Sequence, residues 1–362
     1  MEYWQGAMEG LGMNPSFWKG KTVFLTGHTG FKGGWIAHWL YELGAAVHGY
    51  SLEPPTQPNF FTETQLQKRL VQSTIGDIRD LATLTSALRQ AKPDIIIQMA
   101  AQPLVRESYK TPVETFATNV MGTVNLLEAA RQVGTAKAIV NITTDKCYEN
   151  KEWLWSYREN DRLGGHDPYS SSKACAEIAA AAYRNSFLAD ANIYLASVRA
   201  GNVIGGGDWA TDRLIPDFLR AFDAGKILII RSPNAIRPWQ HVLEPLSGYL
   251  LLAEKLYTEG SAFAEAWNFG PNDEDAKPVS WIVEKLCAQI PGAHWEIKNV
   301  KQPHEAGLLK LDSSKAKAKL GWAPRWTLET ALSKTTEWHQ AWRNREDMAV
   351  ISTQQIQAYA NS

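Results

Sequence analysis

The chain has 362 residues, of which 44% are hydrophobic and 21% are charged, as in an ordinary globular protein with a large core. Its formal net charge of −1 excludes a global field that would attract nucleic acid or an anionic membrane, so a phosphorylated ligand would need a local site. The chain has three cysteines without paired or CxxC spacing, no secretory signal and no apolar run near about 20 residues, which together predict a cytoplasmic protein without disulfides, a metal signature or a membrane span.

Strand-like and helical segments alternate through the first 200 residues. In chain order, the predicted elements are a strand at 21–27, a helix at 31–44, a strand at 45–52, a helix at 80–91, a strand at 93–101, a helix at 112–134, a strand at 137–144, a helix at 168–187 and a strand at 193–203. This alternation predicts an α/β fold with a Rossmann-like, doubly wound parallel sheet.

The pattern loosens after about residue 200, where glycines, prolines and charges separate short helices. The segment 266–270 looks like one more strand that could rejoin the sheet. We therefore expect a smaller, partly interleaved C-terminal substrate domain. The expected boundaries are 14–200 with about 232–270 for the nucleotide-binding domain, 201–231 and 271–345 for the substrate domain, and 1–13 for an N-terminal extension.

The stretch TGHTGFKG places Gly27, Gly30 and Gly33 between a strand and a helix. Glycines at this spacing permit a tight turn, a close approach of a pyrophosphate and close packing of the helix on the sheet. The phosphates then lie at the positive end of the helix. Because strand, loop, helix and next strand follow in order, the pattern predicts dinucleotide binding.

The ends of the next two strands bear on which dinucleotide is bound. Glu53 lies slightly beyond the position where NAD folds present an acidic residue, and no arginine stands there to meet the additional phosphate of NADP, which favours NAD. In GDIRD (76–80), Asp77 and Ile78 are candidates for cradling the adenine, although Asp77 could instead cap the following helix.

An acid and a base, Asp145 and Lys146, follow Thr144 directly after the strand-like segment 137–144. An isolated pair of this kind is typical of a solvated turn. However, ligands of doubly wound sheets bind beyond the carboxyl ends of the strands, where this corner lies. Tyr169 and Lys173, four residues apart, share one face of the following helix, where the ammonium would favour the phenolate and so a general base.

In this order, TGHTGFKG, MAAQ, NVMGT, TTDK and YSSSK resemble an extended short-chain dehydrogenase/reductase that acts on nucleotide sugars, and TDRLIP and IRPWQHV extend the resemblance over nearly the whole chain. Among these enzymes, GHTGFKGGW with TTDKCY is most similar to the CDP-glucose branch of the 4,6-dehydratases, since the dTDP-glucose branch typically has Thr-Asp-Glu. Members of the family serve deoxysugar and O-antigen biosynthesis.

The resemblance implies a three-step reaction on tightly held NAD. Tyr169 takes the proton of the 4-hydroxyl while hydride leaves C4, water is lost across C5 and C6, and the hydride returns to C6. Asp145 is the candidate general acid, which requires a carboxyl with a raised pKa. Lys146 is either the C5 base, as a neutral desolvated amine, or an electrostatic stabiliser of the enolate. Thr144 either hydrogen-bonds the 4-oxygen or bonds backbone.

The resemblance also implies binding residues, and no metal site. The implied cofactor positions are Gly27, Thr29, Gly30, Phe31, Lys32, Gly33, Asp77, Ile78, Ala100, Ala101, Tyr169 and Lys173. The implied substrate positions are Asn202, Arg213, Leu214, Arg237, Asn268, His304 and Glu305. We expect Asn119 to hold the helix and active-site backbone, and His28 to be a packing residue.

Three alternatives remain open. The first is another nucleotide-sugar dehydratase, with a dTDP- or GDP-linked substrate. The second is a nucleotide-sugar 4-epimerase, which would share the glycine loop and Tyr–Lys pair without needing an acid at Asp145. A non-catalytic cofactor-binding scaffold would be expected to lose Tyr169 or Lys173, and both are present. In relatives, the helices at 112–133 and 168–187 pair with a second subunit, which implies a homodimer or homotetramer.

Overall fold

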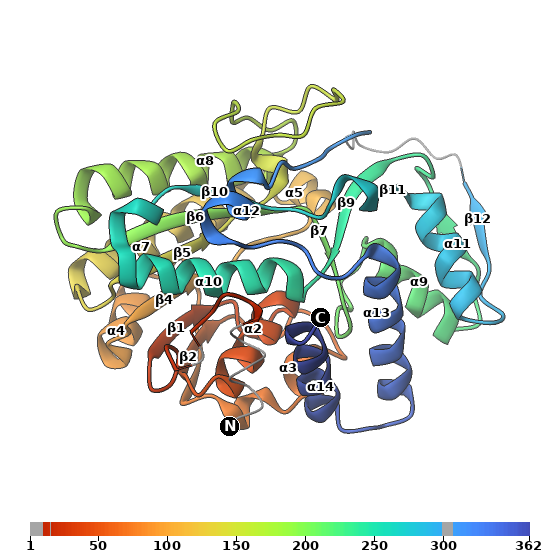
Figure 1. Ribbon diagram of the computed structural model, residues 1–362, viewed down its shortest axis with the longest axis horizontal. Coiled ribbons are helices and arrows are strands. Elements are labelled where there is room, and N and C mark those ends of the chain that lie inside the picture. The colour runs from red at the N-terminus through yellow and green to blue at the C-terminus, as the bar shows by residue number, and fades with distance from the viewer. Residues whose placement is uncertain (1–9, 15, 299–306) are drawn as a thin grey trace.

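Figure 1 shows the computed structural model of the protein, which describes residues 10–14, 16–298 and 307–362. A seven-stranded sheet forms its centre in the order β10-β6-β5-β4-β1-β2-β3, and every neighbouring pair is parallel. Its strands are β1 (Thr22–Thr26), β2 (Ala46–Ser51), β3 (Gln72–Ile75), β4 (Ile95–Gln98), β5 (Ala138–Ile142), β6 (Tyr194–Ala200) and β10 (Ala266–Phe269). The predicted doubly wound parallel sheet is confirmed.

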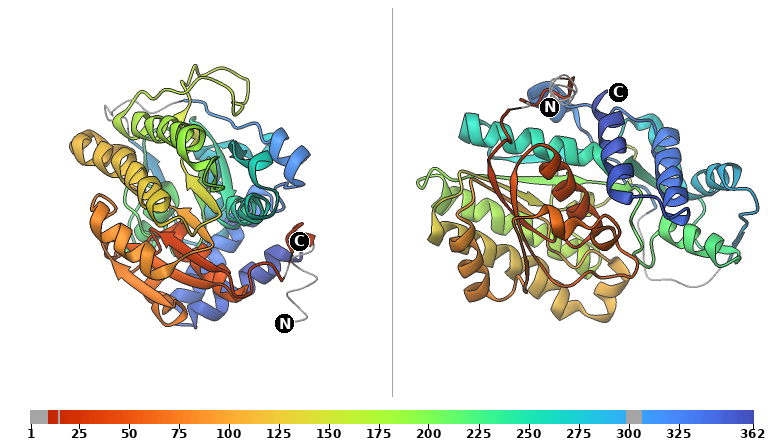
Figure 2. Two further views of the ribbon diagram at one scale, coloured as in Figure 1. Left: turned by 90° about the vertical axis from the view of Figure 1, so that its left-hand side faces the viewer. Right: turned by 90° about the horizontal axis from the view of Figure 1, so that it is seen from below.

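Helices cover both faces of this sheet (Figures 1 and 2). Successive side chains of a strand point to opposite faces. In β1, Val23 and Leu25 pack with helices α2 (Phe31–Glu42) and α10 (Leu243–Glu259). Phe24, between them, packs with α4 (Leu81–Ala91), α7 (Gly122–Val133) and α8 (Pro168–Tyr183). The strands are therefore apolar on both sides, as a sheet buried between two helical layers requires.

Two predicted helices contain a wider turn. The helix predicted at 112–134 consists of α6 (Pro112–Phe116), a π-helical turn η2 (Ala117–Met121) and α7. The helix predicted at 168–187 is α8 followed by a second π-helical turn, η4 (Arg184–Leu188). Turns of this kind often occur at functional sites, and η2 carries Asn119 toward the Tyr–Lys helix.

The prediction of one strand at 193–203 is wrong. Strand β6 ends at Ala200, and after Gly201 the chain enters β7 (Asn202–Ile204), which belongs to a separate three-stranded sheet in the order β11-β9-β7. A side chain at Gly201 would collide with the ring of Pro238 in β9, so glycine is required where the chain changes sheets. The segment predicted to rejoin the main sheet does so as β10, beside β6.

The remaining elements complete the first part of the chain and build the smaller region at one end of the molecule (Figure 1). They are α3 (Phe60–Glu63), η1 (Leu66–Arg69), α5 (Val105–Lys110), η3 (Asp145–Cys147), α9 (Leu214–Asp223), β8 (Leu228–Ile230), β9 (Ile236–His241), η5 (Gly260–Phe263), η6 (Asp273–Asp275), β11 (Ala276–Pro278), α11 (Val279–Gln289), β12 (Trp295–Ile297), α12 (Ser314–Leu320), α13 (Leu328–Arg343) and α14 (Met348–Ala360).

The last helix, α14, lies beyond the predicted domain boundary and packs against α2. The rings of Trp39 and Tyr359 meet edge to face at 5.9 Å, and His38 Nε2 lies 2.8 Å from Thr353 Oγ1. The division into two domains stays a prediction. In the part of the chain that the structure describes, no helix is both long and apolar enough to cross a membrane.

Candidate active site

The glycine loop joins β1 to α2 in the geometry that a dinucleotide needs. Gly27 has a φ of +76°, and a Cβ there would lie 2.9 Å from the backbone nitrogen of Ala100. Helix α2 has Gly30 at its N-cap, with no capping side chain and no acidic residue in its first turn. Its first N–H groups are thus available to a pyrophosphate, whose charge the helix dipole favours. These features fit NAD.

Other residues predicted to bind the cofactor surround this loop. Thr29 is held by hydroxyl contacts of 2.8 Å to Ser51 Oγ and to the carbonyl oxygen of Leu52, at the end of β2. Ala100 and Ala101 lie just beyond the end of β4, after Met99. Asp77 follows β3 and forms an ion pair of 2.6 Å with Arg79.

The alternative role for Asp77, as the cap of the next helix, is wrong. Asp80 caps α4 by accepting a hydrogen bond from the backbone of Thr83. Ile78 is buried, and a Cβ at Gly122 would overlap its side chain, so Ile78 fills the space beside α7.

Strand β5 delivers the acid–base pair into the interior rather than into a solvated turn. Thr144 caps the short helix η3 by accepting a hydrogen bond from the backbone of Lys146, and its hydroxyl donates to Asp145 Oδ1 at 3.0 Å. Asp145 is only 2% exposed, and its Oδ2 has no hydrogen-bond partner among the described residues. An unsatisfied buried carboxylate oxygen is costly, which marks this atom as a candidate for contact with a ligand.

Burial raises the pKa of Asp145, while Lys146, the Thr144 hydrogen bond and Arg237 oppose the rise. The direction is the one required of a carboxyl that must hold a proton near neutral pH. Lys146 is half-buried beside it. The positive charge of Lys146 opposes the rise in the pKa of Asp145. The role of Lys146 as base or stabiliser stays a prediction.

Helix α8 places Tyr169 and Lys173 against the same corner. The helix begins at Pro168, and Asp167 caps it by accepting a hydrogen bond from the backbone of Ser170. Burial raises the pKa of Tyr169 to about 12, and the nearby Thr144 hydroxyl opposes that rise. Lys173 donates to the carbonyl oxygen of Ile142 at 3.2 Å. Thr144, Asp145, Tyr169 and Lys173 therefore form one cluster.

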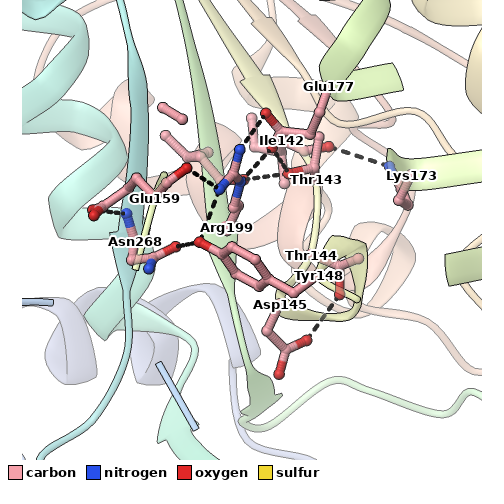
Figure 3. A network of polar contacts seen from close by, with 12 residues as sticks. Ile142, Thr143, Thr144, Asp145, Tyr148, Glu159, Lys173, Glu177, Arg199 and Asn268 are labelled. Atoms are coloured by element: carbon pink, nitrogen blue, oxygen red, sulfur yellow. Dashed lines mark hydrogen bonds and ion pairs between the residues drawn. The ribbon is translucent and has the colours of Figure 1, made fainter. Parts of the chain in front are cut away.

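A buried polar network that was not predicted from the sequence lies behind this cluster (Figure 3). Arg199 of β6 donates to both carboxylate oxygens of Glu177, at 2.9 and 3.0 Å. Thr143 donates to the same carboxylate at 2.5 Å. Although burial opposes ionisation, Arg199 holds the pKa of Glu177 below its usual range. One signal was available: Glu177 lies four residues after Lys173, on the face that carries Tyr169.

The same network continues to Asn268, which was predicted to bind substrate. Its Oδ1 accepts a hydrogen bond of 2.7 Å from Tyr148, and its Nδ2 donates to the backbone oxygens of Tyr157 and Asp312. Tyr148 also accepts a hydrogen bond from Arg199 at 2.8 Å. Asn268 is fully buried, so here it links β10 to the segment that follows the catalytic corner.

The predicted phosphate-binding arginines lie at the same end of the sheet. Arg213 donates to Asp208 at 2.8 Å, and although burial opposes its charge, Asp208 raises its pKa. Its charge also acts on Tyr169. Arg237 of β9 is buried, donates to the backbone oxygen of Ile236 at 3.0 Å, and acts on Asp145.

Of the remaining predicted substrate positions, two lie within the described residues and two lie outside them. Asn202 lies in β7 and Leu214 begins α9, both half-buried. His304 and Glu305 lie outside the described residues. The structure thus brings Arg213 and Arg237 toward the catalytic cluster, and leaves the substrate contacts of all these residues as predictions.

Two further polar residues face the cluster. Lys32, predicted to contact only the cofactor, donates to the hydroxyl of Tyr249 on α10 at 3.2 Å. Burial lowers the pKa of Lys32 to about 7, assisted by the charges of Lys173 and Arg213 and opposed by Asp145. Burial raises the pKa of Tyr249, as do Asp145 and Tyr169. Tyr249 was not predicted, since nothing in the pattern of α10 distinguishes it from a core aromatic.

Two residues expected to be structural are so. Asn119 donates to the backbone of Gln102 at 3.1 Å and to Ser172 of α8 at 2.9 Å, which fixes the Tyr–Lys helix to η2. His28 is fully buried, with Nε2 2.7 Å from Ser73 Oγ, and burial lowers its pKa to about 4.

Comparison with known proteins finds similar sequences over most of the chain. The sequence profile of the family described as GDP-mannose 4,6 dehydratase matches residues 24–335. A CDP-glucose 4,6-dehydratase of Salmonella typhimurium is 56% identical over 97% of this chain and 99% of its own length. A dTDP-glucose 4,6-dehydratase of Xanthomonas campestris is 25% identical over 89% of this chain and 94% of its own.

Solved structures share the fold. A UDP-glucose-4-epimerase from Stenotrophomonas maltophila with bound NAD superimposes with a TM-score of 0.77 at 18% identity, covering 90% of this chain and 99% of its own. A dTDP-glucose 4,6-dehydratase from Bacillus anthracis in complex with NAD gives a TM-score of 0.73 at 22% identity, again over 90% and 99% of the two chains. At these identities the likeness concerns the fold alone.

Proposed function

The chain belongs to the GDP-mannose 4,6 dehydratase family, and we propose that it is a CDP-glucose 4,6-dehydratase that forms CDP-4-keto-6-deoxy-glucose on bound NAD. The relative with 56% identity over nearly its full length supports CDP-glucose as the substrate. The observation that carries the chemistry is the buried cluster of Thr144, Asp145, Tyr169 and Lys173, in which the carboxyl has a raised pKa.

NAD, held at the N-terminus of α2, would supply the hydride acceptor and donor. Tyr169 would accept the proton of the sugar's 4-hydroxyl, with Lys173 favouring the phenolate. Burial lowers the pKa of Lys173 to about 8, and Glu177 opposes that fall. Asp145 would donate a proton to the hydroxyl that leaves C6, because hydroxide alone is a poor leaving group. Its Oδ2 has no hydrogen-bond partner among the described residues, which supports this role.

Lys146 would take and return the C5 proton, in the position where the dTDP-glucose branch has glutamate. Arg213 and Arg237 would bind the diphosphate, for which the guanidinium fork is suited. Asn202, Leu214, Asn268, His304 and Glu305 remain proposed substrate positions, with Asn268 acting through the segment that it anchors.

We also propose a cytoplasmic homo-oligomer. Large apolar side chains are exposed on the neighbouring helices η2, α6 and α8, where relatives are expected to pair: Val113, Phe116, Met121 and Ile178. Apolar surface gathered on adjacent helices is typical of an interface. The three cysteines are free, which suits a reducing compartment.

The second candidate is a nucleotide-sugar 4-epimerase, which would share the glycine loop and the Tyr169–Lys173 pair. An epimerase eliminates nothing and has no use for a buried proton donor at Asp145. The deciding experiment incubates the protein and NAD with CDP-, dTDP-, UDP- and GDP-glucose and examines the products by mass spectrometry. Loss of one water from CDP-glucose alone is expected, and an isomer of unchanged mass would overturn the proposal.

A further inference from the structure

We propose that Glu177 and Arg199 are positioning residues of the reaction, because together they hold both flanks of the catalytic corner (residues 144–146) from behind. The flanks are Thr143, directly before the corner, and Tyr148, directly after the short helix η3 that contains it. The inference rests on the proposed dehydratase function and deepens it. It assigns to the buried ion pair a role in water loss, the step that depends on the acid at the corner.

The corner itself is held only weakly by its own hydrogen bonds. Helix η3 is a single turn of 3₁₀-helix, in which hydrogen-bond geometry is poorer than in an α-helix. Its backbone hydrogen bonds are long, at 3.3 Å from Cys147 N to Thr144 O and 3.5 Å from Tyr148 N to Asp145 O. Asp145 Oδ1 accepts its hydrogen bond from the adjacent Thr144, so this contact moves with the turn. The orientation of the acid therefore depends on what fixes the two ends of the turn.

The first flank is fixed through both its backbone and its side chain. The amide of Thr143 donates to the carbonyl oxygen of Val198 in β6 at 2.8 Å. Its hydroxyl donates to Oε1 of Glu177, on helix α8, at 2.5 Å. The last residue before the corner is thereby tied to a strand of the sheet and to the helix that carries Tyr169 and Lys173.

The second flank is held by the part of the Arg199 guanidinium that Glu177 leaves free (Figure 3). Nε and Nη2 of Arg199 donate to the two carboxylate oxygens at 2.9 and 3.0 Å. Nη1 donates to the Tyr148 hydroxyl at 2.8 Å and to the backbone oxygen of Glu159 at 3.0 Å. Because the guanidinium is planar and its N–H donors form a fixed fork, the carboxylate that binds Thr143 also determines where Tyr148 lies.

Solvent is largely excluded from this network. Thr143, Tyr148, Glu177 and Arg199 are each between 1% and 6% exposed. Water is therefore poorly placed to replace a hydrogen bond that breaks, and a buried polar atom without a partner is costly. The hydrogen bonds of the pair thus resist displacement of either flank, and with it displacement of the turn between them.

Two other roles for the pair would have different consequences. A purely structural pair would change only the amount of folded enzyme, so that every step of the reaction would fall in proportion. A pair that acts through Lys173, one turn away on α8, would mainly affect oxidation at C4, where Lys173 assists Tyr169. A positioning pair acts through the corner, and so on the loss of water to which Asp145 donates the proton.

The test removes the two flank hydroxyls and leaves the ion pair in place. A double variant, Thr143→Val with Tyr148→Phe, keeps both side-chain shapes and the contacts between Glu177 and Arg199, so neither buried charge loses its partner. With NAD and CDP-glucose, this variant should slow water loss on the order of 10²-fold more than oxidation at C4, the cost of a small misplacement of a catalytic group. Reduced nicotinamide, followed by its absorbance, should then accumulate during turnover. An unchanged ratio of the two rates, or a larger effect on oxidation, would overturn the proposal.

Two single variants serve as controls. Thr143→Ser retains the hydroxyl and should retain the ratio of the two rates. Thr335→Val removes another buried hydroxyl, which donates to the backbone oxygen of Ala331 within α13 at 2.7 Å and lies outside the network. It should lower both rates equally or neither. The same altered ratio in Thr335→Val would show that lost stability is the cause, and would contradict a positioning role.

Amide hydrogen exchange supplies a readout without turnover. Mass spectrometry of the NAD-loaded protein follows exchange at the backbone amides of Cys147 and Tyr148, whose hydrogen bonds close the turn. These amides should exchange on the order of 10-fold faster in the double variant, the equivalent of about one lost hydrogen bond, and at the unaltered rate in Thr143→Ser and Thr335→Val. Equal exchange in the double variant and the unaltered protein would refute the role of the pair. If the unaltered enzyme makes no 6-deoxy product, the proposed function fails, and the exchange result still decides whether the pair holds the corner.

Discussion

The carboxylate of Glu177 accepts two hydrogen bonds from the guanidinium of Arg199 in a buried layer directly behind the catalytic corner. Helix α8 thus carries three functional side chains at successive turns, with Tyr169 and Lys173 at the corner and Glu177 beneath it. The pair joins that helix to β6, and through Tyr148 to the segment after the corner. The Glu177–Arg199 pair therefore affects the stability of the fold, and the charge of Glu177 also favours the protonated form of Lys173.

Glu177→Gln should destabilise the protein by about 3–5 kcal/mol, because it leaves the Arg199 cation buried and unpaired. Urea unfolding measures the change. The double variant Glu177→Leu with Arg199→Met should recover most of the loss, since two apolar side chains replace the whole pair. A double variant as unstable as the single one would show that the pair itself contributes the stability.

The free energy of unfolding should rise with pH above about 7 through Lys32. Its pKa is about 7 in the folded protein and 10.5 as the ordinary value, so between these limits the unfolded chain binds a proton that the folded chain lacks. Below about pH 7, Lys32 is protonated in both the folded and the unfolded chain. The folded protein then bears the full destabilisation of a buried positive charge. Lys32→Met should remove this slope.

Above pH 7, the slope that remains in Lys32→Met should begin only near pH 8, where Lys173 loses its proton in the folded protein. Denaturant unfolding of the cofactor-free protein at a series of pH values checks both points. Parallel curves for the variant and the unaltered protein would refute the assignment to Lys32.

Asp145→Asn should still oxidise the sugar at C4 but should lose water on the order of 10²–10⁴-fold more slowly, because an amide has no acidic proton to donate. Mass spectrometry after borodeuteride trapping detects the 4-keto sugar that retains its 6-hydroxyl, because its reduction leaves a deuterium label on a hexose. Full formation of the 6-deoxy product would remove Asp145 from the role of acid.

Lys146→Met should slow exchange of the C5 proton with deuterated water by on the order of 10²-fold if the amine is the C5 base. Nuclear magnetic resonance of the recovered sugar measures the exchange. Lys146→Arg is the matched control, since it keeps a charge that cannot act as a base. Normal exchange in the arginine variant would leave Lys146 with an electrostatic role alone.

Local patterns predicted the central sheet and the catalytic cluster because each depends on residues that are close in the chain. Gly27, Gly30 and Gly33 lie in one loop, and Tyr169 and Lys173 in one helix. Thr144–Lys146 lie at a strand end, and parallel strands bring such ends to one edge of the sheet.

The unpredicted features depend on long-range contacts. The hydrogen bond from Lys32 to Tyr249 joins residues 217 positions apart, and the one from Tyr148 to Asn268 joins residues 120 apart. Gly201 ends the strand predicted at 193–203, because Pro238 occupies the space that a side chain would need. No local periodicity contains these neighbours, so the sequence did not predict these contacts.

At Gly201 the chain passes directly from β6, in the cofactor sheet, to β7, in the sheet that carries Arg237. Any rocking of one sheet against the other would have to twist the backbone at this point or bend a strand. A Gly201→Ala substitution would place a Cβ against Pro238. It would therefore displace Arg237 from the diphosphate, whereas the glycine loop that binds the cofactor would keep its conformation.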